Sequence, residues 1–370
     1  MPQFALGNLV TLVRALGFTV VALAILAWIG TPISIRLRAV NPPVMRIVMG
    51  PLVGWALLSA SAYLVLPLYP YQAGLPIILA IFTIINIFLL YSARLTATKP
   101  TLRVLHSYVP AVILFLSLIL VVLFILLSPH IYHDTLPLFV DNADEQYFVE
   151  LTDWLWANPQ GWRLTGTPWT IERGWSYHLI VAFSRFVPWI DGYEVVALVG
   201  YIAITMAIVP VAGLIMDGTG ASIRTSAIAA TAVPLHGLVA WTPSYGFGPN
   251  AVAVAAFSWV LWAIGPALSN RSPSARNWAS LAVGFALMAH TPLMAIPLLC
   301  LTTILGIHCV LQNDKWRRLR NLVLILSFGG LLAFGALIDV TRWAFGGDLA
   351  KLIRLAADPL DTDGAGWGLT

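Results

Sequence analysis

The sequence predicts an all-α protein that crosses a membrane about ten times, and three observations support this fold class. Of the 370 residues, 59% are hydrophobic and only 10% are charged, whereas soluble domains average roughly 25% charged residues. Apolar runs of about 18–22 residues recur along the chain, and each is long enough to cross a hydrocarbon core of roughly 30 Å. Basic residues gather in short clusters between those runs, as is typical of loops that set membrane topology.

Nine apolar runs carry the predicted spans, and the longest of them is divided in two. Residues 279–310 are too long for one span and have basic residues on both flanks. We therefore expect two segments that meet at His290–Pro292, where proline removes a backbone donor. The N-terminus is then outside. The predicted spans are 15–34, 47–68, 74–92, 109–128, 195–216, 225–242, 249–267, the two parts of 279–310, and 321–341.

The orientation follows from the basic residues. Thirteen of the twenty lie between spans on one predicted side, which the positive-inside rule assigns to the cytoplasm. This topology requires that residues 176–188, SYHLIVAFSRFVP, do not cross the membrane. That run is short, contains His178 and Arg185, and has Trp175 and Trp189 beside it. We therefore predict a juxtamembrane helix that lies along the interface.

This topology divides the chain into three parts. Residues 1–108 form N-terminal membrane helices, residues 109–341 form a core of further spans, and residues 342–370 form an external segment. The core includes an external loop, 129–194, which holds juxtamembrane helices. The abrupt ending after the last span suggests that a C-terminal region has been lost or cut away. The net charge of +4 does not indicate nucleic acid, because the basic residues are placed to set topology; membrane lipids are the expected surroundings.

The external loop is acidic. Seven of the sixteen acidic residues lie between residues 129 and 174. Structural explanations compete with a functional one, because Asp141 or Asn142 would cap the next helix and early acids suit its positive end. That helix, EQYFVELTDWLWANP, is amphipathic, and we predict that its apolar face lies on the membrane surface. The side chains of this face are Phe148, Leu151, Leu155 and Trp156.

Short motifs occur on both sides of this loop. A span is followed by DEQYF (Asp144–Phe148), which opens the surface helix, and IERG (Ile171–Gly174) precedes YHLIVAF and further spans. Together they resemble the GT-C class of membrane glycosyltransferases over residues 109–341. The chain departs from that class in its three extra leading spans, its missing Pro-Pro pair and its missing C-terminal region. The resemblance implies transfer of a hexose or pentose from a polyprenyl-phosphate donor to a glycan or lipid acceptor, on the outer face of a prokaryotic plasma membrane.

The resemblance also implies site residues. In that class an aspartate of the first external loop lies at the active site, and Asp144 matches it, with Asp141 and Glu145 in reserve. Arg173 matches a basic residue near the lipid phosphate. The chemistry needs this pair, because a carboxylate takes the proton of the acceptor hydroxyl and a guanidinium stabilises the departing phosphate. Further predicted substrate-binding residues are Arg163, His178, Tyr245, Asn250 and His290.

Several of these features have a second interpretation. Clustered carboxylates suit a divalent cation, and His130 and His133 stand near Asp134, but interfacial histidines explain that spacing. We predict no metal site and no required cofactor. The turn WTPSYGFGPN, residues 241–250, either completes a sugar pocket or forms an aromatic belt between spans. His290 is either a pocket residue or a buried group with a structural hydrogen bond.

Two other functions stay open at this point. A transporter or flippase would build its site at a broken helix such as the one predicted within 279–310. A non-catalytic GT-C-like scaffold would keep the fold without the chemistry. The chain has no internal repeat and no ionisable residue in the middle of a lining helix, and its charges concentrate at the outer surface. This pattern favours chemistry on a lipid head group over translocation.

Overall fold

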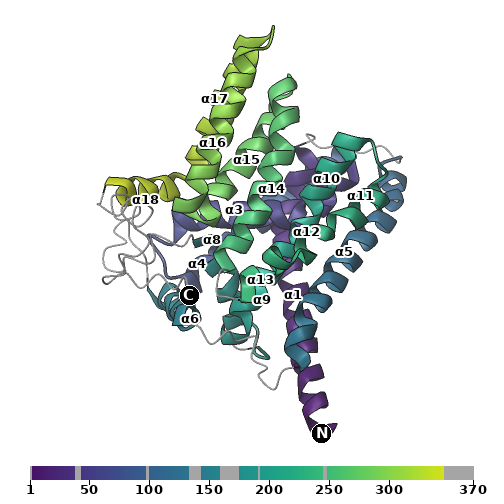
Figure 1. Ribbon diagram of the computed structural model, residues 1–370, viewed down its shortest axis with the longest axis vertical. Helices are drawn as coiled ribbons and strands as arrows, with labels where there is room; N and C mark the ends of the chain where they lie inside the picture. The colour runs from purple at the N-terminus through teal and green to yellow at the C-terminus, as the bar shows by residue number, and fades with distance from the viewer. Residues whose placement is uncertain are drawn as a thin grey trace.

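The computed structural model describes residues 2–37, 43–96, 100–132, 143–158, 175–190, 192–244 and 248–345. These residues form helices and turns with no strand among them, which confirms the all-α prediction. Helices are expected in such an apolar chain, because backbone polar groups in hydrocarbon must be satisfied within the segment itself. Figure 1 shows the helices gathered into a bundle, with the start of α1 at one end and the junction of α16 and α17 at the other.

The chain order of the helices is simple, and most connections are short. Proline opens several of the helices, where its missing N–H is not needed. The elements are α1 (Pro2–Arg36), α2 (Pro43–Val48), α3 (Gly50–Val65), α4 (Tyr71–Thr96), α5 (Pro100–Tyr132), α6 (Ala143–Ala157), α8 (Trp175–Val181), the 3-10 helix η1 (Ala182–Phe186), α9 (Gly192–Met206), α10 (Ile208–Thr219), α11 (Ile223–Ala230), α12 (Ala232–Leu235), α13 (Gly237–Ser244), α14 (Gly248–Ser269), α15 (Pro273–Ala289), α16 (Thr291–Val310), α17 (Lys315–Leu332) and α18 (Phe334–Phe345).

Six segments among the described residues are long and apolar enough to cross a membrane, which supports a multi-pass membrane protein. The predicted count of ten is not confirmed, because the helices Gly50–Val65 and Ile223–Leu235 are apolar but shorter. The six segments are Leu9–Arg36, Tyr71–Leu89, Val109–Ser128, Glu194–Thr219, Gly248–Ser269 and Leu293–Val310.

Two predicted spans are divided into pieces. The run 225–242 becomes α11, α12 and α13, and the chain between the last two is extended at His236, with φ −65° and ψ 128°. Proline at 234 contributes to this break, because it cannot donate to the helix ladder. The run 321–341 becomes α17 and α18, which meet at Ala333 with φ −103° and ψ 27°. Hydrophobicity alone did not reveal either break.

The division of the longest run is confirmed. Helix α15 ends at Ala289, and His290 leaves the helical region with φ −156° and ψ 81°. Helix α16 then begins at Thr291 with proline in its first turn. The two segments therefore meet at His290, as the proline-based argument predicted, although α15 begins earlier than expected, at Pro273.

Small residues bring α1 and α3 into close contact. A Cβ atom on Gly30 would lie 2.1 Å from the carbonyl oxygen of Gly50, and one on Gly54 would lie 1.9 Å from the carbonyl oxygen of Leu26. Glycines 50 and 54 have the four-residue spacing that lets membrane helices approach at their backbones. This spacing is visible in the sequence and marks α3 as a helix able to pack closely against another helix.

The basic residues of three helices lie at one end of the bundle, which we call the basic end. Helix α1 finishes at Arg36, and its last turn lines a cavity with the start of α15. The start of α15 is also joined to α17, because Arg276 donates to the Asn321 side chain at 3.1 Å and Asn321 donates to the Asn270 carbonyl oxygen at 3.1 Å. This grouping agrees with the predicted topology.

An ion pair marks the opposite end of the bundle. Arg14, in the N-terminal half of α1, pairs with Glu194 in the first turn of α9 at 2.8 Å. The same guanidinium donates to the backbone oxygen of Trp189, just before α9. Because α6, α8 and η1 contact α9, these described elements of the predicted external loop belong to this opposite end.

Candidate functional site around helix α8

Helix α8 is enclosed by protein. Each residue from Ser176 to Phe183 is at most 2% exposed, and α8 contacts α3, α6, α9, α14 and α15. The run 176–188 forms only a seven-residue helix and one 3-10 turn, too short to cross a membrane. The prediction that it lies along the membrane surface is corrected in one respect: between Ser176 and Val181, the part of α8 whose side chains the structure describes, no apolar side chain is left for lipid, because protein covers it.

Hydrogen bonds from other helices hold α8 in place. The indole Nε1–H of Trp55 donates to the Ser176 carbonyl oxygen at 2.8 Å, and the hydroxyls of Ser59 and Ser176 lie 2.9 Å apart. The Tyr71 hydroxyl donates to the Leu179 carbonyl oxygen at 2.7 Å. The last carbonyls of a helix have no intrahelical partners, and buried polar groups require partners. The bond from Tyr71 of α4 meets that need at Leu179, while the bonds from α3 fix the first turn of α8 at Ser176.

Replacing Trp55 by phenylalanine is expected to lower the stability of the fold by about 1–3 kcal/mol, because a buried hydrogen bond between α3 and α8 would be lost and the smaller ring would leave part of the indole's space empty. Trp28→Phe is the matched control, since its Nε1–H donates to Thr83 Oγ1 at an exposed position, where the indole is not enclosed by protein and no backbone carbonyl loses a bond. Thermal unfolding of both variants in the same detergent measures the difference. Equal losses in the two variants would contradict this role for Trp55.

His178 joins α8 to α6. Its Nδ1 lies 3.4 Å from the Thr152 hydroxyl, and its ring meets the Tyr177 ring edge-on with centroids 5.4 Å apart. Both partners in the His178–Thr152 contact are nearly inaccessible, at 2% and 3% exposed. The imidazole therefore helps to position α6. Its predicted contact with a substrate remains a prediction, because protein covers the ring in this structure.

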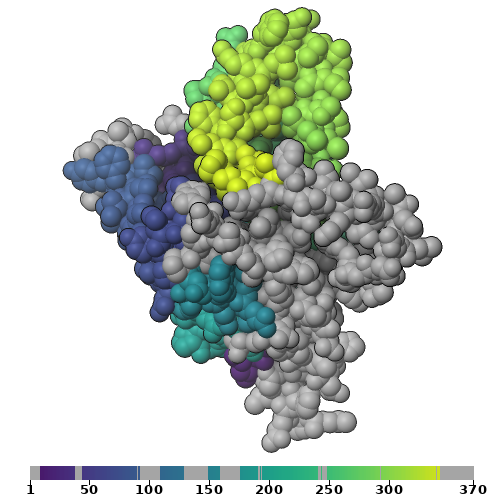
Figure 2. Space-filling model, turned by 90° about the vertical axis from the view of Figure 1, so that its left-hand side faces the viewer, coloured from purple at the N-terminus to yellow at the C-terminus, as the bar shows by residue number. Residues whose placement is uncertain are grey.

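The apolar face of α6 packs against protein. Leu151 and Leu155 are 6% and 3% exposed, and the Trp156 ring lies 4.8 Å from the Phe186 ring of η1. The prediction that this face lies on the membrane surface is therefore wrong for these residues, because α4, α8 and α9 already cover it. In Figure 2, α6 appears as a teal element at the surface beside the blue N-terminal helices, and Asp153 on its outer side pairs with the Arg185 guanidinium.

The predicted catalytic residues belong to the start of α6. Asp144 and Glu145 stand in its first turn, which begins at Ala143. At 1.5 Å per residue, Asp144 lies about 12 Å along the helix axis from Thr152, where α6 touches α8. Their side chains lie outside what the structure describes, so the predicted pairing of carboxylate and guanidinium is not tested. Asp141, Arg163, Arg173 and Tyr245 also fall outside the described residues.

Two other predicted substrate-binding residues lie on helices that meet α8. Asn250 is a partly exposed residue in the first turn of α14, and a Cβ atom on neighbouring Gly248 would fall 2.4 Å from the Tyr177 ring. His290 is 8% exposed and stands where α15, another neighbour of α8, ends. The three described candidates, His178 among them, therefore belong to elements that converge on one buried helix.

Sequence reasoning missed the residues that build this centre. Trp55 and Ser59 were read as part of an apolar span, and Thr152 as part of a surface helix. The sequence feature that could have identified these residues is a polar group within an apolar run, because such groups tend to face protein and not lipid. Among the side chains that the structure describes, no group of three or more histidines, cysteines or acidic residues could hold a metal; the carboxylates of residues 141–145 lie outside that set.

Comparisons with known proteins give no relative for this chain. No protein-family model, no curated protein and no solved structure matches it. The fold and composition define a multi-pass helical membrane protein. Because a fold does not determine an activity, any reaction has to be argued from the site residues.

Proposed function

We propose that the protein is a membrane glycosyltransferase that moves a sugar from a polyprenyl-phosphate donor to a glycan or lipid acceptor. The observation that carries this proposal is the attachment of α6. Its inner face is buried against α4, α8 and α9, and Thr152 bonds to His178. The acidic first turn of α6 is therefore held by a rigid element, which is what a catalytic carboxylate requires.

The proposed reaction uses one carboxylate and one guanidinium. An acceptor hydroxyl oxygen forms a bond to the anomeric carbon while the bond from that carbon to the phosphate oxygen breaks. Asp144 takes the hydroxyl proton, and Arg173 stabilises the departing polyprenyl phosphate through paired N–H donors. No general acid is needed, because the phosphate leaves as a stable anion. A single displacement inverts the anomeric centre.

The experiment that tests this proposal is a transfer assay in liposomes. Purified full-length protein is reconstituted with polyprenyl-phosphate donors that carry a labelled hexose or pentose, together with a lipid and glycan extract from a bacterial envelope. We expect label to move from the donor to an acceptor, with release of polyprenyl phosphate, only when the protein is present.

The same assay separates the alternatives. Label that crosses the bilayer while still attached to its lipid would identify a flippase and overturn the proposal. Donor that stays intact with every sugar tested, beside an active control transferase in the same liposomes, would favour a non-catalytic scaffold. Measuring both released polyprenyl phosphate and labelled acceptor distinguishes transfer from simple donor hydrolysis.

A further inference from the structure

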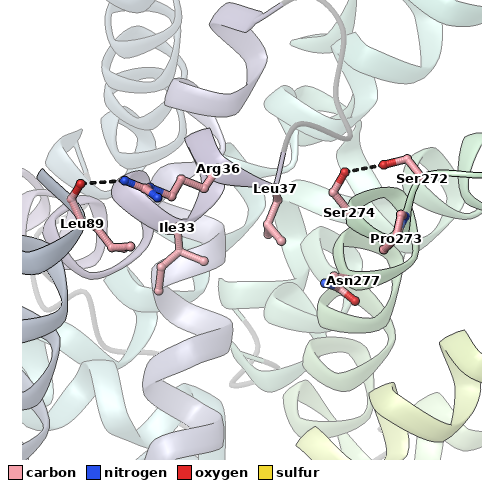
Figure 3. A pocket seen from close by; sticks show the side chains of 8 residues that line it. All are labelled: Ile33, Arg36, Leu37, Leu89, Ser272, Pro273, Ser274 and Asn277. Atoms are coloured by element: carbon pink, nitrogen blue, oxygen red, sulfur yellow. Dashed lines mark hydrogen bonds between the residues drawn. The ribbon is translucent and has the colours of Figure 1, made fainter. Parts of the chain in front are cut away.

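A cavity lies at the basic end of the bundle, beside the C-terminal end of α1 and away from the site described above. It has a volume of about 610 Å³, is open to its surroundings, and is lined by the end of α1, by Leu89 of α4 and by the start of α15. Figure 3 shows Arg36 beside Leu89 at one side of the cavity and the residues of α15 at the other. The apolar lining residues are Ile33, Leu37, Leu89 and Pro273, and the polar ones are Arg36, Ser272, Ser274 and Asn277.

The charge of the cavity wall is positive. Arg36 donates to the Leu89 carbonyl oxygen at 2.7 Å, a bond that fixes the guanidinium beside the cavity (Figure 3). None of the lining residues is acidic.

The start of α15 adds partial positive charge. Ser272 is its N-cap, but the Ser272 hydroxyl lies 2.6 Å from the Ser274 hydroxyl and does not cap the helix. The next residue, Pro273, has no N–H. The N-terminal end of a helix carries a positive dipole that favours anions, and here it lies across the cavity from Arg36, whose guanidinium is directed toward Leu89 (Figure 3).

The cavity lies beside the end of a candidate membrane span, since Arg36 is the last residue of Leu9–Arg36. Below this level, α1 and α4 present apolar side chains outward, including Ile35 at 40% and Phe88 at 69% exposed. An occupant of the cavity would therefore meet positive charge at its head and apolar helix surface beside it.

We propose that this cavity binds the head group of an anionic phospholipid from the leaflet at the basic end. The phosphate lies against Arg36, the polar groups of the head group extend across the cavity toward Ser272, Ser274 and Asn277, and the acyl chains follow the apolar surfaces of α1 and α4. Basic pockets between membrane helices are suited to such head groups. A free phosphate ion would contact Arg36 but leave the apolar lining residues uncovered, so the lining favours the lipid. This inference does not depend on the proposed glycosyl transfer.

Native mass spectrometry of the full chain in detergent tests the proposal. The protein is titrated with phosphatidylglycerol, with phosphatidylcholine of the same acyl chains, and with inorganic phosphate. We expect phosphatidylglycerol to bind preferentially. Arg36→Gln should weaken that binding at least about tenfold, because it removes a charge-assisted contact. Asn277→Trp should weaken it similarly by filling the cavity while the charge is kept.

Arg224→Gln is the matched control. Arg224 is an exposed residue at the start of α11 and does not line the cavity, so its loss removes the same charge elsewhere. Binding by this variant should stay within about twofold of the parent. Equal affinity for the two phospholipids, or equal affinity of the parent and both cavity variants, would overturn the proposal. Phosphate binding that Arg36→Gln abolishes, without preference for the lipid, would assign the cavity to a free anion instead.

Discussion

Replacing Gly54 by leucine is expected to separate α1 from α3 and to destabilise the fold by more than about 4 kcal/mol, a loss seen when a substitution clashes with fixed structure. The cause is the 1.9 Å distance from a Cβ atom on Gly54 to the Leu26 carbonyl oxygen. Cβ atoms essentially never approach a heavy atom closer than 3.0 Å. The obstacle is backbone, so no side-chain rotation relieves it, and Gly30→Leu should behave in the same way.

Gly306→Leu provides the matched control for this packing test. Gly306 lies in α16, where an added Cβ would meet nothing within 4 Å. Size-exclusion chromatography of each variant in detergent, followed by thermal unfolding, measures the outcome. We expect monodisperse protein from Gly306→Leu and aggregated or absent protein from Gly54→Leu. A well-folded Gly54→Leu variant with parental stability would contradict the close approach of α1 and α3.

Asp144→Asn is expected to reduce glycosyl transfer by roughly 100- to 10,000-fold, the contribution typical of a general base. Asparagine has nearly the same shape but cannot accept the proton of the acceptor hydroxyl. The change should leave the melting temperature unaltered, because Asp144 stands in the first turn of α6 and the helix is anchored further along, at Thr152. Initial rates in the liposome assay, normalised to folded protein, give the measurement.

Glu150→Gln is the control for this substitution, since it makes the same chemical change at an exposed position of the same helix. It should retain most of the parental rate. Loss of transfer in Glu145→Gln, with activity kept in Asp144→Asn, would move the catalytic role to the neighbouring carboxylate. Equal, small effects in all three variants would remove the acidic turn from the mechanism.

The class of fold could be predicted because the length of an apolar run is a strong indicator of a membrane-spanning helix. Runs such as 109–128 needed no partner to be recognised, and the break at His290 followed from a proline. The interruptions at His236 and Ala333 were missed, since both leave the apolar character of the run unchanged; Pro234 was the local signal for the first of them. Similarly, the spacing of Gly50 and Gly54 was visible, but its meaning depends on the helix opposite.

The site was harder to predict for a physical reason. Residues 176–188 have the length and composition of a surface helix, and nothing in them reveals that five other helices surround it. Burial of α8 is a property of the whole bundle, set by donors such as Trp55 and Tyr71 that are remote in the chain. The elements that carry His178, Asn250 and His290 were expected near one another, and they converge on α8. The roles of these residues remain predictions.

The long separation between Trp55 and Ser176, 121 positions along the chain, bears on the order of assembly during synthesis. The ribosome completes α3 and α4 well before α8, so the indole of Trp55 and the hydroxyl of Tyr71 enter the bilayer before their eventual acceptors have been made. Because α8 also contacts α14 and α15, which are made later still, its burial is completed only after most of the chain has been synthesised. Side chains from the first hundred residues therefore take part in a late step of assembly.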